Sequence, residues 1–232
     1  MSVLQGIRLH SPELDVFGQM ALDETLAQTR PEAFLLRFFR WAGPAATFGY
    51  AQRFREVERA LPPGIGAACT RRPTGGGIVP HLDDLTFSCV FPAGGVLRHG
   101  AIYRRLHAAI LGSLRNLGLQ ARLSAAPGGH APHGPAGATQ CFLQPVEQDI
   151  LTDSGKVLGG AIRRYRDTVL YQGSLQMADA RPRAAAYEEA IAAALAGEWG
   201  LRWQRRGVAA EVLEAARARA AKYRDPEWIR KS

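Results

Sequence analysis

The chain has 232 residues, of which 47% are hydrophobic, so its length suits one large domain or two small ones and its apolar content suffices for a buried core. The formal net charge of +8 favours acidic partners or a solvated arginine-rich surface, whereas the lack of a compact basic run with interleaved aromatics argues against nucleic-acid binding. No apolar run reaches the roughly 18 residues of a transmembrane helix, and residues 1–5 have neither the basic region nor the apolar run of a signal peptide, so we expect a cytoplasmic protein without membrane contact.

The first half of the chain predicts one helix, three strands and a second helix. Apolar residues at helical spacing predict a helix at 18–28. Aromatic and β-branched residues then predict strands at 34–41, 46–50 and 86–91. Helical spacing returns at 101–117.

The second half begins with a loop and ends in helices. Seven Pro and Gly residues between 125 and 139 predict the loop. Asp153-Ser154-Gly155 predicts a hairpin turn, and 168–175 reads as a strand. Ala-rich segments at about 184–197 and 208–222 predict the last helices. Without repeats or an interdomain linker, the pattern predicts an α+β fold in one domain spanning 1–232.

The most distinctive segment is Arg71-Arg72-Pro73-Thr74-Gly75-Gly76-Gly77, with His81 shortly after it. Glycines let a backbone approach a ligand closely, and arginine neutralises anions with a planar fork of donors. An isolated glycine triplet is usually a turn, and the missing Gly-Lys-Ser/Thr ending excludes a Walker phosphate loop. The flanking charges favour a loop that binds an acyl chain or an anionic ligand.

A second glycine segment, Lys156-Val157-Leu158-Gly159-Gly160-Ala161, carries a single lysine. A lysine after Ser-Gly is usually a solvated turn residue. Beside a binding loop, however, it can polarise a carbonyl or hold a phosphate oxygen. The pairing of the two segments favours this second interpretation.

Cys141 is the candidate nucleophile. It follows the Pro/Gly-rich loop and precedes Phe142, and a thiolate is strongly nucleophilic where nearby cations lower its pKa. Cys69 and Cys89 lie in apolar contexts and are expected in the core, which is also the alternative for Cys141. The odd number and spacing of the cysteines argue against disulfides and zinc, and we predict no metal site.

Together these segments resemble the biotin/lipoate protein ligase superfamily, and within it the cysteine-dependent octanoyltransferases and lipoate-protein ligase A-like proteins. The resemblance covers nearly the whole chain. It is carried by the segments 20–24, 36–41, 48–52, 71–81, 84–88, 141–142, 156–161, 172–175 and 222–228. The chain departs from the usual family pattern at Gly160, where Ser is common, at Gln172, where His is common, and at Pro80.

The resemblance implies a catalytic domain of that superfamily, with a mixed β-sheet packed with helices and an acyl tunnel beside the glycine-rich loop. It implies that an octanoyl or lipoyl group passes from acyl carrier protein through a Cys141 thioester to a lysine of a lipoyl-domain protein, such as the glycine cleavage H protein. Lys156 would contact the acyl carbonyl, and no cofactor would be required. The implied substrate-binding residues are Arg71, Arg72, Thr74, Gly75, Gly76, Gly77, His81, Gly159, Gly160 and Ala161.

Two alternatives remain open. In an ATP-dependent lipoate-protein ligase whose accessory domain is a separate polypeptide, Arg71, Arg72 and Lys156 would hold an acyl-adenylate, and ATP and Mg would be needed. In a non-catalytic acyl- or biotin-binding module, Cys141 would belong to the core. Ligases of this family usually lack the cysteine and need a further C-terminal domain, for which this chain is expected to be too short, and both points favour the transferase.

Overall fold

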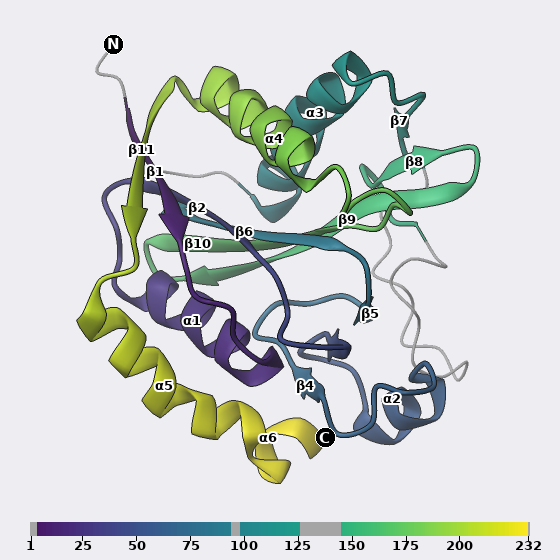
Figure 1. The fold of residues 1–232 in the computed structure, drawn as a ribbon, viewed down its shortest axis with the longest axis vertical. Coiled ribbons are helices and arrows are strands. Elements are labelled where there is room, and N and C mark those ends of the chain that lie inside the picture. Colours follow the sequence, from purple (N-terminus) through teal and green to yellow (C-terminus); the bar gives the residue numbers. More distant parts are fainter. Residues whose placement is uncertain (1–3, 94–97, 126–144, 232) are drawn as a thin grey trace.

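The computed structural model describes residues 4–93, 98–125 and 145–231 of the chain. Figure 1 shows an α+β fold in which helices pack on both faces of a large sheet. The elements are β1 Leu4–His10, α1 Val16–Gln28, β2 Phe34–Phe39, β3 Ala45–Phe48, α2 Phe54–Ala60, β4 Cys69–Arg71, β5 Ile78–His81, β6 Leu85–Pro92, α3 His99–Asn116, β7 Arg122–Leu123, β8 Ile150–Thr152, β9 Gly155–Tyr165, β10 Thr168–Leu175, α4 Ala184–Trp199, β11 Leu201–Gly207, α5 Ala210–Arg224 and α6 Pro226–Arg230. No helix among these is long and apolar enough to cross a membrane.

The large sheet is mixed, with the strand order β11-β1-β2-β6-β10-β9-β8-β7. Strands β11, β1 and β2 run parallel, and the pairs from β2 through β6, β10, β9 and β8 to β7 are antiparallel. Helices α3 and α4 cover one face, and α1 and α5 cover the other (Figure 1). A smaller sheet, β4-β3-β5, carries the glycine-rich loop between β4 and β5.

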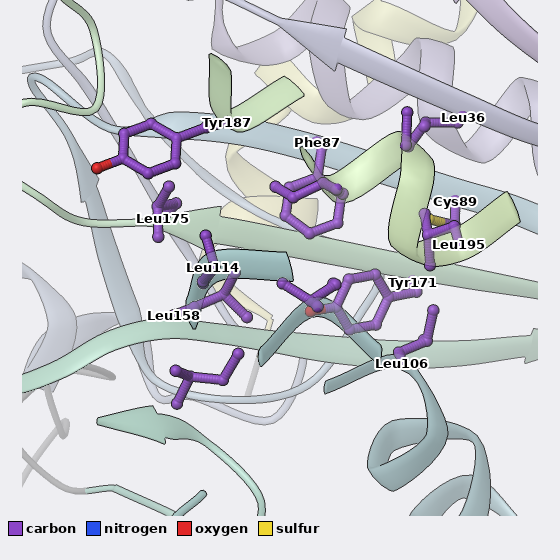
Figure 2. Close-up of a cluster of buried hydrophobic side chains, with 14 of the residues drawn as sticks. Leu36, Phe87, Cys89, Leu106, Leu114, Leu158, Tyr171, Leu175, Tyr187 and Leu195 are labelled. Atoms are coloured by element: carbon purple, nitrogen blue, oxygen red, sulfur yellow. The ribbon is translucent and has the colours of Figure 1, made fainter. Parts of the chain in front are cut away.

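The strands at the centre of the large sheet are buried on both faces. In β2, Phe34 and Leu36 pack into the cluster under α3 and α4, whereas Leu35 packs into the cluster under α1 and α5. Figure 2 shows part of the first cluster, which includes Cys89 and Leu195. A strand covered on both faces needs a mostly apolar run, which is the pattern of 34–39 apart from Arg37. Each buried Leu or Phe side chain stabilises the fold by about 1.5–3 kcal/mol.

Helix α1 brings polar groups into the centre of the molecule. Its N-cap residue is Asp15, whose carboxylate accepts a 2.7 Å hydrogen bond from the Gly18 amide. Because α1 lies between the sheet and α5, even Gln19 and Asp23 are fully buried. Asp23 is compensated by Arg37 of β2, at 2.5 Å. This ion pair fixes α1 beside the strands that line the site described below.

The predicted elements are confirmed to within a few residues at their ends, and β10 has the predicted bounds. Seven short or polar elements escaped prediction: β1, α2, β4, β5, β7, β11 and α6. Strand β11 carries three arginines and is mostly exposed, so it lacks apolar alternation. It starts directly after Gly200, whose φ of 62° ends α4. The predicted loop at 125–139 lies, except for its first residue, outside the described residues.

Candidate active site

A narrow cavity lies between the β9-β10 hairpin and the smaller sheet. Five of the predicted substrate-binding residues line it: Arg72, His81, Gly159, Gly160 and Ala161. Its other lining residues are Met20, Trp41, Thr47, Val79, Thr86, Gln172, Gly173 and Ser174. Sequence elements far apart in the chain, predicted separately as binding segments, therefore meet at one cavity.

The glycine-rich loop packs directly on the segment that follows β3. A Cβ atom on Gly49 would lie only 1.9 Å from the carbonyl oxygen of Gly76, so both backbones meet without side chains between them. Gly76 has a φ of 90°, a conformation that side-chain-bearing residues rarely adopt. The Tyr50 amide donates a hydrogen bond of 2.8 Å to the Thr74 carbonyl. These contacts hold residues 74–77 against the small sheet.

Arg71 does not line the cavity, and its role differs from the predicted contact with an anion. All five of its guanidinium N–H donors go to backbone carbonyls. The acceptors are the carbonyls of Tyr50, Gln52, Trp228, Ile229 and Lys231. Arg71 therefore fastens the C-terminal helix α6 to the start of the glycine-rich loop, a contact that local sequence spacing does not reveal.

Arg72 points the other way, into the cavity wall. Its guanidinium donates to the Gly75 carbonyl at 3.1 Å through Nε and lies 3.4 Å from the Thr47 hydroxyl through one terminal nitrogen. The same hydroxyl lies 3.0 Å from Nε2 of His81. Arg72 thus shapes the glycine-rich loop from inside while it presents positive charge to the cavity.

His81 is held by a buried carboxylate. Its Nδ1 lies 2.9 Å from Asp84 Oδ2, and its ring stacks on Trp41 at 3.9 Å. The same oxygen accepts hydrogen bonds from the hydroxyls of Thr86 and Ser174, each at 2.7 Å. Burial alone would raise the pKa of Asp84, but the charge of His81 and these hydrogen bonds outweigh it and lower that pKa. One end of the cavity is therefore a fixed polar wall.

Gln172, which stands where the family usually has His, connects the glycine-rich loop to α1. Its amide nitrogen donates to Asp23 at 2.7 Å, and its carbonyl accepts from the Thr74 hydroxyl at 2.7 Å. A glutamine supplies one donor and one acceptor in these directions, so the departure from the family pattern leaves both partners satisfied. Thr74 does not line the cavity itself, but its hydroxyl holds the lining residue Gln172 in place.

The second departure, Gly160, is explained by close packing. A Cβ atom on Gly160 would lie 2.4 Å from the ring and hydroxyl of Tyr171. Tyr171 is fully buried and bonded through its hydroxyl to Nε2 of His107 at 2.8 Å, so the ring cannot move aside easily. The tyrosine occupies the space that a serine side chain would need.

We expect Gly160→Ser, which restores the common family residue, to destabilise the protein by about 1–3 kcal/mol because it overpacks the contact with Tyr171. The measurement is the melting temperature, with thermal unfolding monitored by circular dichroism. Gly75→Ala is the matched control, since no heavy atom lies within 4 Å of a Cβ there. Equal melting temperatures for Gly160→Ser and the parent would contradict the packing explanation.

Lys156 lies under the cavity wall beside Gly159. Its ammonium pairs with Asp149 at 2.8 Å, and both side chains are almost completely buried. A Cβ atom on Gly159 would lie 2.4 Å from the lysine Nζ, so this glycine makes room for the lysine. The sequence prediction that Lys156 and Gly159 act together is consistent with this placement, whereas Asp149 was not predicted.

His107 forms a buried neutral site behind this pair. Its Nδ1 donates to the Gln148 carbonyl at 2.8 Å, and its Nε2 accepts from the Tyr171 hydroxyl. Burial, followed by the charge of Lys156, lowers the pKa of His107 to about 3. The imidazole therefore stays neutral in the folded protein while the unfolded chain titrates near 6.5.

This difference predicts acid sensitivity. Below pH 6.5 His107 becomes protonated in the unfolded chain, whereas in the folded protein it stays neutral down to about pH 3. The free energy of unfolding therefore falls as the pH is lowered through this range. Between pH 7 and pH 5 the loss should be about 2 kcal/mol from this group alone. Urea unfolding of the parent and His107→Gln at both pH values measures it, and the variant should show the smaller pH difference. His99→Gln, at an exposed position, should leave the pH difference as in the parent.

The two described cysteines are poor nucleophiles. Burial, opposed in part by Arg72, raises the pKa of Cys69 to about 12. Burial, followed by the charge of Asp23, raises the pKa of Cys89 well above its ordinary value. Both thiols are in the core, as expected. Cys141 lies outside the described residues.

Several polar residues of the site were missed by sequence reasoning. Trp41, Thr86 and Asp84 fall within segments that carry the family resemblance, but their hydrogen bonds could not be foreseen. Asp149 had the weakest signal, because one acidic residue before a strand is common. Thr86, Asp84 and Asp149 are buried polar side chains, and burial of this kind is the signal that points to function.

Comparison with known sequences places these features in a family. Residues 15–196 match the model described as Lipoyl protein ligase A/B catalytic domain. The octanoyltransferase LipM of Moorella thermoacetica is 32% identical over 169 residues, which cover 69% of this chain and 61% of that protein. LipM of Kyrpidia tusciae is 27% identical, with 95% of this chain and 96% of that protein covered. The chain thus spans about three-fifths of the length of the first relative and nearly all of the second.

Solved structures share the fold. Protein Ta0514 from T. acidophilum with bound lipoic acid superposes with a TM-score of 0.78 at 21% identity, covering 99% of each chain. Lipoate-protein ligase A bound with ATP gives a TM-score of 0.78 at 21% identity, covering 98% of each chain. A bi-partite lipoate protein ligase from Thermoplasma acidophilum, studied with its E2 lipoyl domain, gives 0.72 at 18% identity and covers 99% of this chain.

Proposed function

The chain belongs to the lipoyl protein ligase A/B catalytic-domain family, and on this basis we propose that it is an octanoyltransferase of protein lipoylation. The observation that carries the proposal is the position of the buried Lys156 directly behind Gly159, which lines the cavity. Arg72 and Val79, which flank the glycine-rich loop, line the same cavity. Similarity to LipM octanoyltransferases supports the same reaction. Residues 1–232 are proposed to act as a single catalytic domain in the cytoplasm.

In the first step, the Cys141 thiolate attacks the thioester carbonyl of an octanoyl group on acyl carrier protein. A carbon–sulfur bond forms to Cys141, the bond to the carrier's sulfur breaks, and the carrier leaves as a thiolate that takes up a proton. One thioester replaces another, so the step is close to isoenergetic and divides the total barrier. Lys156 stabilises the negative charge that develops on the carbonyl oxygen.

In the second step, the amine of a lysine on the acceptor attacks the acyl-enzyme. A carbon–nitrogen bond forms, the amine loses a proton, and the Cys141 thiolate leaves. The acceptor is proposed to be a lipoyl-domain protein such as the glycine cleavage H protein. The net charge of +8 favours encounters with acidic carrier and acceptor proteins.

The remaining predicted residues bind the acyl chain from both sides. Gly159, Gly160 and Ala161 offer a flat strand surface, and Arg72 and His81 close the opposite side. Thr74 and the glycines 75–77 hold the loop in place from outside the cavity lining. Arg71 supports the loop through its contacts with α6 and does not contact the substrate in this proposal.

The test is intact-protein mass spectrometry after incubation with octanoyl-carrier protein and no ATP. We expect one octanoyl adduct on the enzyme, which disappears when a lipoyl domain is added and reappears as octanoylated lipoyl domain. Absence of the adduct and of the product would overturn the proposal.

A second candidate is an ATP-dependent lipoate-protein ligase that works with a separate accessory polypeptide. It is favoured by the similarity in fold to lipoate-protein ligase A bound with ATP and to the bi-partite ligase. Of the three cations expected to hold an acyl-adenylate, Arg71 has all its donors on backbone carbonyls, which leaves Arg72 and Lys156. Pyrophosphate release that requires lipoate, ATP and Mg, with no octanoyl adduct, would favour this candidate.

A further inference from the structure

The carboxylate of Asp149 is the described ion-pair partner of Lys156. Asp149 Oδ2 lies 2.8 Å from the lysine Nζ, with the lysine side chain 2% exposed and the aspartate side chain 0% exposed. A buried ammonium is strongly disfavoured unless an opposite charge compensates it. The missing side chain at Gly159 confines the lysine further, since a Cβ there would lie 2.2 Å from its Cε. The end of the lysine is thus confined on the strand side by Gly159 and on the other by Asp149.

Asp149 is itself fixed by two further donors. The Tyr103 hydroxyl donates to Oδ1 at 2.5 Å, and the Val146 amide donates to Oδ2 at 2.7 Å. Burial, followed by the nearby charge of Asp149, raises the pKa of Tyr103 well above its ordinary value, so the phenol remains a donor. The Gly160 amide donates to the same phenol oxygen at 3.1 Å. One tyrosine hydroxyl therefore joins the carboxylate to the strand that lines the cavity.

The backbone before Asp149 is held by the next turn of α3. The His107 ring stacks on Tyr103 at 3.9 Å, and its Nδ1 donates to the Gln148 carbonyl at 2.8 Å. Gln148 has a φ of 70°, in the left-handed region that residues other than glycine rarely adopt. Such strain persists only where surrounding contacts determine it, and it is concentrated at functional sites. Tyr103 and His107, four residues apart on one face of α3, together fix both the side chain and the backbone of this acidic residue.

We infer that Asp149 is the positioning residue for Lys156, and that Tyr103 and His107 form the support that holds Asp149 in place. The inference rests on the proposed function, because it assigns the pair the task of placing one ammonium beside the reacting carbonyl. Asp149 does not touch the substrate. It fixes the direction of the ammonium, and a misplacement of about 1 Å in such a group can cost about 10²-fold in rate.

The experiment compares Asp149→Asn and Tyr103→Phe with the parent in octanoyl transfer from carrier protein to a lipoyl domain. Asp149→Asn should lower kcat about 100-fold and change KM less than about threefold, because positioning acts on the reacting complex. Tyr103→Phe, which removes one hydrogen bond to a charged group, should lower kcat about tenfold. Tyr187→Phe is the matched control: Tyr187 lies on α4, its hydroxyl donates to Asp179, and loss of this tyrosine–aspartate hydrogen bond should leave both constants unchanged.

A second readout does not depend on the proposed function. Acetic anhydride acylates accessible lysine amines, so Lys156, quantified by peptide mass spectrometry, should be modified slowly in the parent, where it is buried against Asp149, and several-fold faster in Asp149→Asn, where it is released from its ion-pair partner. Parental kcat and parental Lys156 labelling in Asp149→Asn would overturn the inference. If the parent forms no octanoyl adduct, the proposed function fails, while faster labelling in the variant still supports the pairing. If Asp149→Asn does not fold, a parental kcat in Tyr103→Phe overturns the inference.

Discussion

Cys141→Ala will abolish formation of the octanoyl-enzyme and reduce transfer to the lipoyl domain by at least about 10⁴-fold, as expected for loss of a covalent nucleophile. The two described cysteines cannot replace it. The pKa of Cys69 is raised to about 12 and that of Cys89 is raised well above its ordinary value, so neither provides an appreciable thiolate at neutral pH. The measurement is intact-protein mass spectrometry after mixing with octanoyl-carrier protein, together with the single-turnover rate of transfer.

Cys69→Ala is the control for this prediction, because it removes a buried thiol and should retain the adduct. An adduct that persists in Cys141→Ala and disappears in Cys69→Ala would show that the nucleophile has been assigned wrongly. Transfer at the parental rate by Cys141→Ala, without any adduct, would instead point to direct attack of the acceptor lysine on the carrier thioester.

Lys156→Met will lower kcat by about 10²–10³-fold, because it removes the donor assigned to the developing oxyanion and keeps the apolar stem. The change also leaves Asp149 as a buried carboxylate without the 2.8 Å ammonium, which is expected to cost about 3–5 kcal/mol of folding stability. Activity must therefore be measured below the melting temperature of the variant, with the folded fraction determined by circular dichroism.

Lys222→Met is the matched control for the lysine. Lys222 lies on α5, forms a 2.7 Å ion pair with Glu24, and has a side chain that is 35% exposed; α5 contributes no residue to the cavity lining. Its replacement should change kcat by less than about twofold, since partly exposed ion pairs contribute little. A folded Lys156→Met protein with parental kcat would contradict the role of Lys156 in either step.

The fold was largely predictable where one segment carries its own periodic signal. Local apolar spacing, which depends only on neighbours in the chain, predicts strand β10 and helices α1, α3, α4 and α5. The short strands β4 and β5 could not be predicted, because three or four residues contain too little pattern. The edge strand β11 could not be predicted for a different reason: its exposed arginines hide the alternation of apolar and polar residues that is typical of a strand.

The site was predicted in its parts, but only five of the ten predicted binding residues line the cavity. The two glycine segments were expected to meet, and Gly159, Gly160 and Arg72 do line one cavity. Arg71 and Arg72 are adjacent and chemically identical, so the sequence could not separate them. Strand alternation sends their side chains to opposite sides, one to the carbonyls of α6 and one to the cavity.

The sequence by itself determined the class of fold, the glycine-rich backbone segments and the candidate nucleophile and lysine, since each depends on residue type or on local spacing. Only the tertiary structure decided which buried charges meet: Asp149 with Lys156, Asp84 with His81, Asp23 with Arg37 and Gln172, and Arg71 with the carbonyls of α6. Many of these contacts join different elements, and local spacing carries no information about such distances. Their pairing is enforced by the high cost of leaving a charge buried without compensation, a condition that exists only after the chain has folded.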